Sequence, residues 1–361
     1  MSGGVDSAVA AALLKAQGLD VVGMSLKTWS NDQCHEVGAR RCCSLSDIED
    51  ARACAHRLGI PYYVLDVHEA FQRDVIDYFL KEYEEGQTPN PCVHCNEKVK
   101  FGLLLEKAKG LGADAVATGH YARVAWDPGR GRHVLRESVD PSKDQTYVLF
   151  QLSQQALAQA VFPVGELKKE EVREVARGLG LAVADKPDSQ GICFVAKNDR
   201  GAYLQKKIGD RMEAGEIVSS DGRVLGRHEG IPYFTVGQRR GLGVTNGEPL
   251  YVLRVEKETR RVVVGTRGEL DQTFLSAGKL NWIASDGRHA EPIRAHVKIR
   301  YGHPKQPAWI DRVRSGRARV RFDEAQFAIT PGQATVFYDG DVVLGGGWIE
   351  RESADESQDP R

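Results

Sequence analysis

The alternation of strand-like and helical segments constrains the fold of this chain more than any other sequence feature. It runs from Ser7 to about residue 195. Strand-forming runs occupy residues 20–26, 60–67 and 113–120, and helical patterns occupy residues 46–59, 100–112 and 168–180. Alternation of this kind is typical of a mostly parallel sheet covered by helices on both faces. We therefore expect an α/β domain over residues 1–196.

The helical period disappears after about residue 197. Short strand-like runs follow, separated by Gly, Asp and Pro turns, and a break between two modules falls near residues 266–270. This pattern is typical of small sheets and barrels. We predict a small central β domain over residues 197–267 and a C-terminal β-barrel over 268–351. The last segment, 352–361, has nothing to bury and is predicted to be disordered.

Length and charge narrow the class of protein. A chain of 361 residues is too long for one compact core, and it contains no apolar run of membrane-span length and no secretion signal at its start. We therefore expect a cytoplasmic protein with no membrane partner. Residues 1–196 hold 22 Lys and Arg against 27 Asp and Glu, whereas residues 197–351 hold 26 against 19. The basic second half suggests a polyanionic partner such as nucleic acid, with scattered solvated charge as the alternative.

The chain opens with a glycine-rich loop, MSGGVDS, that leads directly into a helix. Glycines let the backbone approach a phosphate closely, and the N-terminus of the helix offers N–H groups to it. The motif lacks the Gly-Lys-Ser/Thr of the common phosphate loop. SGGVDS instead resembles the PP-loop of the ATP pyrophosphatases, which split ATP into AMP and pyrophosphate. A glycine-rich turn that caps an ordinary helix is the alternative.

No strand precedes this loop in the sequence, although such loops follow a strand. That strand would lie in the middle of the sheet, and its loss would leave two ladders of N–H and C=O groups unpaired. We expect the natural reading frame to start upstream of Met1. An N-terminal peptide beginning at Met1 in the native host would refute this expectation.

The seven cysteines are an odd number, so a fully paired secreted framework is excluded. Cys95 follows a Pro-rich turn and precedes a helical pattern, a position where N–H groups at a helix start lower a thiol pKa. Cys193 lies in a Gly-containing turn, where a buried apolar cysteine is the alternative. Cys54, on a predicted helix, is expected in the core.

A further group of potential zinc ligands lies in one polar loop. Its members are Cys34, His35, Cys42 and Cys43. Their spacing lacks a second Cys-x-x-Cys, so the zinc signal is weak. A loop that orders over a nucleotide or RNA is the favoured interpretation.

Ordered motifs along nearly the whole chain resemble the tRNA-specific 2-thiouridylase family. They are SGGVDS, TPNPxxxCN, ATGHYAR, KDQTYVLF, FPVGELKK, DSQGICF, TVGQRRGLG, KIRYGHP and TPGQATVFYDGDVVLGGGWI. The resemblance implies a PP-loop catalytic domain, a small central β domain and a C-terminal β-barrel. It also implies a reaction: ATP, with Mg²⁺, adenylates the C2 oxygen of uridine 34 in tRNA-Lys, tRNA-Glu and tRNA-Gln, and sulfur then displaces AMP.

The resemblance also implies roles for individual residues. ATP would be bound by Met1, Ser2, Gly3, Gly4, Val5, Asp6, Ser7, Leu26 and Gly119. Cys193 would carry a persulfide delivered by a sulfur-relay donor protein, and Cys95 would attack it, closing a disulfide. The tRNA would be contacted by Asn90, Pro91, Cys92, His120, Lys143, Asp144, Gln145, Arg300, Tyr301 and Gln333. Each of four residues has an alternative interpretation outside the motif context. Lys143 and Asp144 would form an exposed ion pair, Arg300 would be a solvated charge, and His120 would be a core or cap histidine.

One residue departs from the family pattern. Many members have Asp at the position of Cys92, which here completes Cys92-Val93-His94-Cys95. Two alternatives to the simple relay follow: Cys92 resolves a disulfide of Cys95, or Cys92, Cys95 and Cys193 hold three corners of a [4Fe-4S] cluster.

Two functions of other classes compete with tRNA thiolation. One is a PP-loop ligase acting on a small metabolite, and the other is a non-catalytic RNA-binding module. The ligase gives no purpose to Cys95, Cys193 or the basic half of the chain. The RNA-binding module predicts tRNA binding without release of AMP. We expect a monomer.

Overall fold

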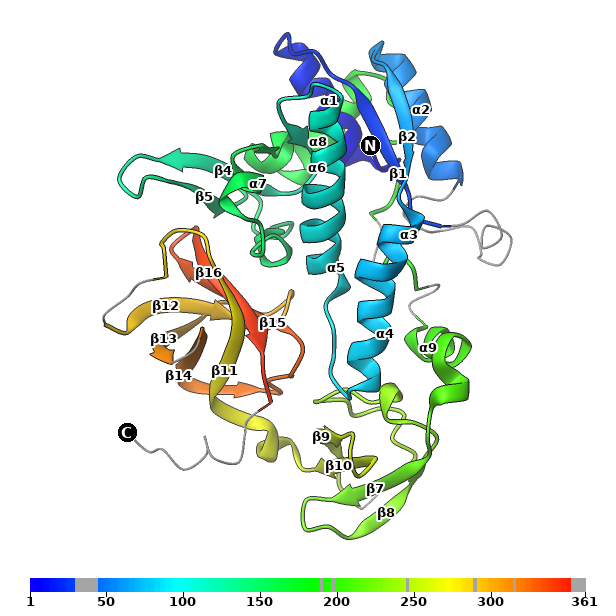
Figure 1. The fold of residues 1–361 in the computed structure, drawn as a ribbon, viewed down its shortest axis with the longest axis vertical. Helices are drawn as coiled ribbons and strands as arrows, with labels where there is room; N and C mark the ends of the chain where they lie inside the picture. The colour runs from blue at the N-terminus through cyan, green and yellow to red at the C-terminus, as the bar shows by residue number, and fades with distance from the viewer. Residues whose placement is uncertain are drawn as a thin grey trace. The chain divides into compact units, whose positions relative to one another are not determined.

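The computed structural model describes residues 1–29, 45–188, 191–195, 199–244, 247–287, 291–313 and 316–351. The chain divides into two compact units (Figure 1). Unit 1 holds Met1–Ile76, Pro91–Arg200 and Asp341–Val343, and unit 2 holds Asp77–Asn90, Gly201–Gly340 and Leu344–Arg361. The predicted zinc or lid loop and the predicted disordered tail lie outside the described residues. Within those residues, no helix is both long and apolar enough to cross a bilayer.

Unit 1 contains the helices and parallel strands predicted for the first half. Its longer helices are α1 (Val5–Ala16), α2 (Leu45–Leu58) and α8 (Lys169–Gly178). Strand β1 (Gly23–Lys27) pairs in parallel with β2 (Tyr62–Asp66), and β3 (Val116–Ala117) with β6 (Ala160–Val161). These elements confirm the strands predicted at 20–26, 60–67 and 113–120 and the helices at 46–59 and 168–180.

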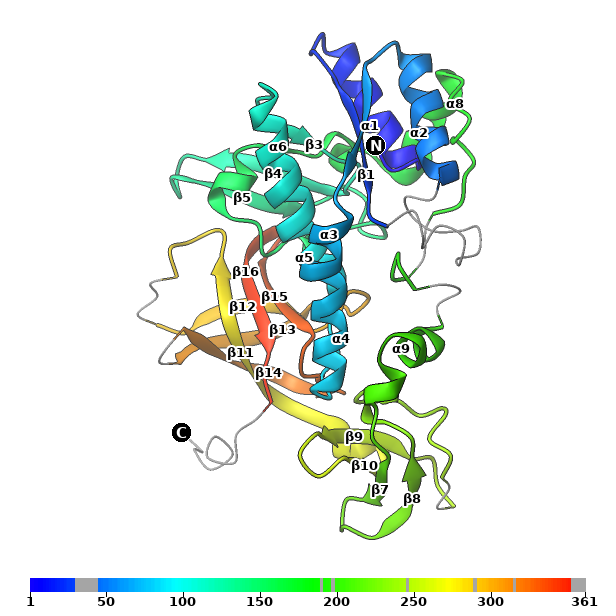
Figure 2. The same cartoon turned by 45° about the vertical axis from the view of Figure 1, so that its right-hand side comes forward.

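The core of unit 1 forms where α1 packs against α8 (Figure 2). Val9 of α1 is fully buried in one cluster with Val172 and Ala176 of α8. Because α1 is rich in alanine, which has the highest helix propensity and a small side chain, it is both stable and able to approach its neighbour closely. This packing fixes the start of α1, where the glycine-rich loop ends.

A continuous helical run begins at Pro91. It comprises α5 (Pro91–His94), the π-helical η3 (Cys95–Leu103) and α6 (Leu104–Gly110). Proline is favoured at the first helical position because its fixed φ suits the helix and its missing N–H would have no partner there. The helix predicted over 100–112 therefore starts nine residues earlier, and Cys95 lies within it rather than before it.

Two other parts of the first half contain elements that were not predicted. Residues 68–84 are helical, as α3 (His68–Phe71), η2 (Gln72–Ile76) and α4 (Asp77–Glu84). Strands β4 (Ala122–Asp127) and β5 (Arg132–Glu137) form an antiparallel hairpin, not part of a parallel sheet. Its Pro128-Gly129 turn is closed by Asp127 Oδ1, which accepts hydrogen bonds from the N–H groups of Gly129 and Arg130 at 3.0 and 3.1 Å. The remaining short helices are η4 (Thr146–Val148), α7 (Gln154–Leu157) and η5 (Pro163–Glu166).

Unit 2 contains a small four-stranded sheet in the order β8-β7-β10-β9. Its strands are β7 (Gly215–Ser219), β8 (Val224–His228), β9 (Tyr251–Glu256) and β10 (Arg261–Gly265). Helix α9 (Arg200–Ile208) precedes them, so the prediction that helices end near residue 197 is wrong there. Only Leu204 and Ile208 of α9 are buried, and two apolar positions among lysines leave little periodicity to detect. Short turns of helix lie at η7 (Gly209–Arg211) and η8 (Ile231–Tyr233).

The rest of unit 2 is a closed six-stranded barrel, as predicted. Its strands are β11 (Asp271–Trp282), β12 (Ile293–Lys298), β13 (Gln306–Val313), β14 (Arg317–Phe327), β15 (Ala334–Asp339) and β16 (Val342–Ile349), preceded by η9 (Arg267–Leu270). The order is β11-β14-β13-β12-β15-β16, and β11 also pairs with β16, which closes the barrel. Closure removes the exposed strand edges that invite aggregation.

Candidate active site

The glycine-rich loop is folded as an anion-binding helix start. Gly3 adopts a φ of 72°, a conformation that favours glycine, and Gly4 is the extended residue before α1. Ser7 Oγ donates to the carbonyl of Gly4 at 3.1 Å and accepts from the N–H of Ser2 at 3.0 Å. The first N–H groups of α1 lack partners within the helix, and its dipole is positive at this end. The loop is therefore suited to phosphate.

Two distant segments approach this loop closely, as the ATP prediction requires. A Cβ added to Gly119 would lie 2.6 Å from both the carbonyl carbon of Asp6 and the amide nitrogen of Ser7. Ser25 Oγ donates to the carbonyl of Met1 at 2.5 Å, from the same strand that carries Leu26. The predicted ATP residues of the loop, of β1 and of the segment after β3 thus lie together in unit 1.

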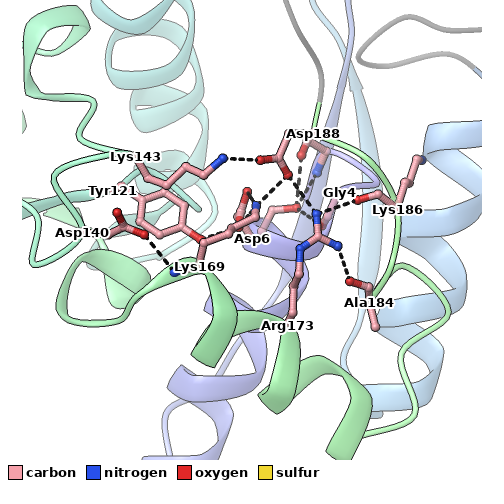
Figure 3. Close-up of polar contacts among 12 residues, drawn as sticks. Gly4, Asp6, Tyr121, Asp140, Lys143, Lys169, Arg173, Ala184, Lys186 and Asp188 are labelled. Atoms are coloured by element: carbon pink, nitrogen blue, oxygen red, sulfur yellow. Dashed lines mark hydrogen bonds and ion pairs between the residues drawn. The ribbon is translucent and has the colours of Figure 1, made fainter.

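A buried lysine is bound to the loop aspartate. Lys169 Nζ lies 2.7 and 2.8 Å from the two carboxylate oxygens of Asp6 and 2.8 Å from Asp188 Oδ1. Figure 3 shows Lys169, at the start of α8, between the two carboxylates. The whole Lys169 residue is only 5% exposed, and the position of its ammonium is therefore fixed by these two partners.

Further groups complete the charge network. Tyr121 Oη donates to Asp6 Oδ1 at 2.7 Å, and burial together with the charge of Asp6 raises the pKa of Tyr121 far above its ordinary value. Lys143 Nζ lies 2.8 Å from Asp188 Oδ2, and this hydrogen bond raises the pKa of Lys143. Burial acts to raise the pKa of Asp188, but hydrogen bonds from Lys143 and Lys169 hold it below its ordinary value. Both carboxylates therefore face cations.

A second lysine fixes the other side of the loop. Lys186 Nζ donates to the carbonyl of Gly3 at 2.9 Å and to Asp47 and Asp50 of α2 at 2.6 Å each. Arg173 of α8 donates to the carbonyl of Ala184 at 2.7 Å, which holds the segment carrying Lys186. The backbone of the loop is thereby tied to both α2 and α8 through charged groups.

His120 is a buried, neutral histidine. Its Nδ1 lies 2.7 Å from Thr118 Oγ1 and its Nε2 lies 3.3 Å from Lys100 Nζ. Burial, with the nearby charge of Lys100, lowers the pKa of His120 well below its ordinary value. Since an ammonium can only donate, Nε2 accepts and the ring proton lies on Nδ1. This environment is that of the core histidine considered from the sequence, and contact with RNA stays a prediction.

The three cysteines of the predicted sulfur chemistry belong to unit 1. Cys92 is exposed, whereas Cys95 and Cys193 are partly buried. Because the helix starts at Pro91, which has no N–H, the N–H groups of its first turn belong to residues 92–94. They lie at Cys92 rather than at Cys95, which corrects the pKa argument made for Cys95. Cys54 is 2% exposed and its pKa is raised by burial, as expected of a core thiol.

The cluster alternative requires three thiolates around one centre. Across the described residues, which include Cys92, Cys95 and Cys193, no three His, Cys, Asp or Glu side chains converge closely enough to hold a metal ion. That result concerns the ligands of one ion, whereas the thiolates of a [4Fe-4S] cluster each bind a different iron, so the cluster stays a hypothesis.

Three parts of the chain match models of known protein families. Residues 1–197 match a family model described as a tRNA methyl transferase HUP domain, residues 201–266 its PRC-barrel domain, and residues 272–349 an aminomethyltransferase β-barrel domain. A tRNA-specific 2-thiouridylase from Clostridioides difficile is 48% identical over 97% of both chains. Those from Symbiobacterium thermophilum and Geotalea uraniireducens are 51% and 52% identical over 97% of this chain, and over 91% and 93% of their own lengths. The chain belongs to the tRNA-specific 2-thiouridylase family.

A solved structure adds nothing to this assignment. NMN synthetase from Francisella tularensis matches 58% of this chain and 73% of its own at 18% identity, with a TM-score of 0.31.

Several residues that the family resemblance assigns to tRNA are engaged within unit 1. Asp144 is buried, where it accepts from the N–H of Ser138 at 3.2 Å and from Thr146 Oγ1 at 2.7 Å. Gln145 Oε1 accepts from the N–H of Tyr121 at 3.0 Å. Asp144 and Lys143 do not form the exposed pair considered from the sequence, because Lys143 is paired with Asp188 instead.

Four other predicted tRNA residues belong to unit 2: Asn90, Arg300, Tyr301 and Gln333. Arg300 Nη1 donates to the carbonyl of Phe327 at 3.2 Å, and Tyr301 is 50% exposed. Gln333 Nε2 donates to the carbonyls of Thr88 and Pro89 at 2.9 and 3.3 Å. This amide therefore holds the segment that ends at Asn90, the last residue of this part of unit 2, directly before Pro91 and Cys92.

Sequence reasoning missed Lys169, Tyr121, Asp188 and Lys186. The sequence did contain a signal for Lys169. Successive spacings of three and four residues, typical of one helix face, separate Lys169, Val172 and Ala176. This pattern places a lysine on the apolar face of α8. A buried lysine needs a charged partner.

Proposed function

We propose that this chain is an ATP-dependent enzyme that converts uridine 34 of tRNA-Lys, tRNA-Glu and tRNA-Gln to 2-thiouridine, releasing AMP and pyrophosphate. The observation that carries the proposal is its similarity, at 48–52% identity and from end to end, to proteins named tRNA-specific 2-thiouridylase. The phosphate-binding form of the loop and the basic second half of the chain support it.

The loop of residues 1–7 would bind the triphosphate of ATP at the start of α1. The C2 oxygen of the uridine attacks the α-phosphorus and pyrophosphate leaves, which converts a poor oxygen leaving group into AMP. Mg²⁺ would enter the site bound to the phosphates of ATP and not to Asp6. Both oxygens of Asp6 already accept hydrogen bonds from Lys169, and Oδ1 also accepts one from Tyr121. Its charge would offset that of the phosphates.

Sulfur would reach the base through Cys193 and Cys95. The Cys95 thiolate attacks the inner sulfur of a Cys193 persulfide, forming a Cys95–Cys193 disulfide and expelling hydrosulfide. Hydrosulfide then adds to C2 of the adenylated base and AMP leaves. A thiol reductant restores both cysteines, and a persulfide donor protein reloads Cys193. The alternative route would transfer sulfur through a [4Fe-4S] cluster held by Cys92, Cys95 and Cys193.

The cellular compartment and the partners of the enzyme follow from this chemistry. Free thiols and a persulfide require a reducing compartment, which supports the cytoplasm as its location. The partners are tRNA and the sulfur donor, and a monomer suffices for the reaction.

The test compares two transcripts of tRNA-Lys that differ only in carrying uridine or cytidine at position 34. The chain, ATP, Mg²⁺ and a persulfide source are incubated with each, and AMP and pyrophosphate are quantified. We expect equimolar AMP and pyrophosphate that depend on the uridine transcript. Equal release with both transcripts, or with neither, would contradict the proposal.

A further inference from the structure

Lys169 combines burial and charge in a way that few residues of this chain do. Twelve polar or charged residues of the described chain are buried, and Lys169 is the one lysine among them. Placing an ammonium in a protein interior is unfavourable unless charged partners compensate. Its partners are Asp6, inside the glycine-rich loop, and Asp188.

Asp6 poses an electrostatic problem for a phosphate site. It lies in the first turn of α1, where the helix would otherwise present only positive potential to an anion. An uncompensated carboxylate there would repel a triphosphate. Lys169 offsets that charge, and its bonds to both Asp6 oxygens also fix the orientation of the side chain.

Asp188 holds the ammonium in turn. Around the two carboxylates lie Lys169, Lys143 and Arg173, the last with Nη2 at 3.4 Å from Asp188. Asp140 belongs to the same network, because its Oδ2 accepts from the N–H of Lys169 at 3.0 Å. The three cations therefore balance three carboxylates, so the charge of Asp6 is cancelled and the N–H groups at the start of α1 remain to attract an anion.

We propose that Lys169 is a positioning residue of the ATP site: it neutralises and orients Asp6 so that the loop accepts the triphosphate, while Asp188 holds the ammonium in place. The inference rests on the proposed ATP-dependent function. It assigns a role in nucleotide binding to a residue on α8, outside the loop itself. A purely structural lysine would stabilise the fold without acting through Asp6.

The test is equilibrium binding of ATP, measured by calorimetry on the full chain. K169M is compared with wild type, and K168M, which removes the neighbouring exposed lysine, is the matched control. Losing a charge-assisted hydrogen bond predicts ATP binding about 10- to 100-fold weaker in K169M, with K168M unchanged. Raising Mg²⁺ should restore part of the binding to K169M, because the ion can then occupy Asp6. ATP binding by K169M equal to wild type would overturn the inference.

A double-mutant cycle separates positioning from folding. The D6N variant has no carboxylate at position 6 to neutralise. Adding K169M to D6N should therefore weaken ATP binding less than about threefold. An equal loss in both backgrounds would assign Lys169 a structural role only. If K169M unfolds, K169M/D188N removes the buried ammonium together with one of its two carboxylate partners, and should fold yet still bind ATP weakly. Wild-type binding by that variant would refute the proposal, whereas wild-type protein that binds no ATP would refute the proposed function instead.

Discussion

At the residue scale, the proposed nucleotide site depends on contacts too close to admit a side chain. Gly119 has no Cβ, and its backbone lies against Asp6 and Ser7. We expect G119A to force the loop from its position, because overpacking of this kind costs about 1–3 kcal/mol. ATP binding by calorimetry should weaken about tenfold or more.

Gly110 provides the control for G119A. It lies in α6, and a Cβ there would meet no atom within 4 Å. G110A should bind ATP as wild type does and melt at the same or a higher temperature, since alanine favours the helix. Unchanged ATP binding in G119A would show that the loop tolerates displacement.

His120 gives the fold a pH dependence. Its pKa is lowered in the native state from an ordinary value of 6.5, so below that pH the unfolded chain binds a proton that the native chain does not. The free energy of unfolding should therefore fall as pH drops from about 7 to 5, by up to about 1.4 kcal/mol per pH unit from this group. When the free energy of unfolding is measured with urea at each pH, it should depend less steeply on pH in H120Q than in wild type. Identical slopes in the two proteins would mean that His120 titrates normally.

Serine substitutions of the three cysteines distinguish the sulfur mechanisms. In the relay, C95S and C193S lose thiolation while C92S retains it, and all three bind ATP normally because none lies in the loop. Sulfur incorporation into tRNA and ATP binding are measured on the same preparations. Loss of thiolation in C92S would instead give Cys92 an essential role, as in disulfide resolution.

At the scale of elements, the barrel supports the segment before Pro91. Gln333 donates to the carbonyls of Thr88 and Pro89, and the N–H of Thr88 donates to the carbonyl of Pro331 at 3.0 Å. We expect Q333A to cost about 1–2 kcal/mol of stability, as two hydrogen bonds are lost. Hydrogen exchange at Thr88 should accelerate.

Gln272 is the matched control for Q333A, because it is exposed on β11. Q272A should leave both the stability and the exchange at Thr88 unchanged. Slow exchange at Thr88 in Q333A would show that the segment is held by other contacts.

The sequence predicted elements with regular patterns and missed those whose pattern is broken. Helices α2 and α8 and strands β1 and β2 follow from their periodicity. Helix α9 shows two buried positions, and residues 68–84 include a π-helical turn that disturbs the helical period. The loop was visible as a motif, but the two partners of Asp6 were not, because Tyr121 and Lys169 are distant from it in sequence and reach it only in the folded chain.

At the scale of the whole molecule, the charge distribution predicts how tRNA binds. Residues 197–351 carry seven more basic than acidic side chains, counted from the printed sequence. Binding through phosphate contacts releases counterions, so tRNA affinity should fall at least about tenfold between about 50 and 200 mM salt. Filter binding at several salt concentrations measures this slope. Affinity that is insensitive to salt would contradict a basic tRNA-binding surface.

The most direct test of the account is nucleoside mass spectrometry of unmodified tRNA-Lys. The tRNA is incubated anaerobically with the full chain, ATP, Mg²⁺ and a persulfide source, and a parallel reaction omits ATP. We predict 2-thiouridine at position 34 in the complete reaction alone. Absence of 2-thiouridine with a chain that binds both ATP and tRNA, or its formation without ATP, would contradict the account.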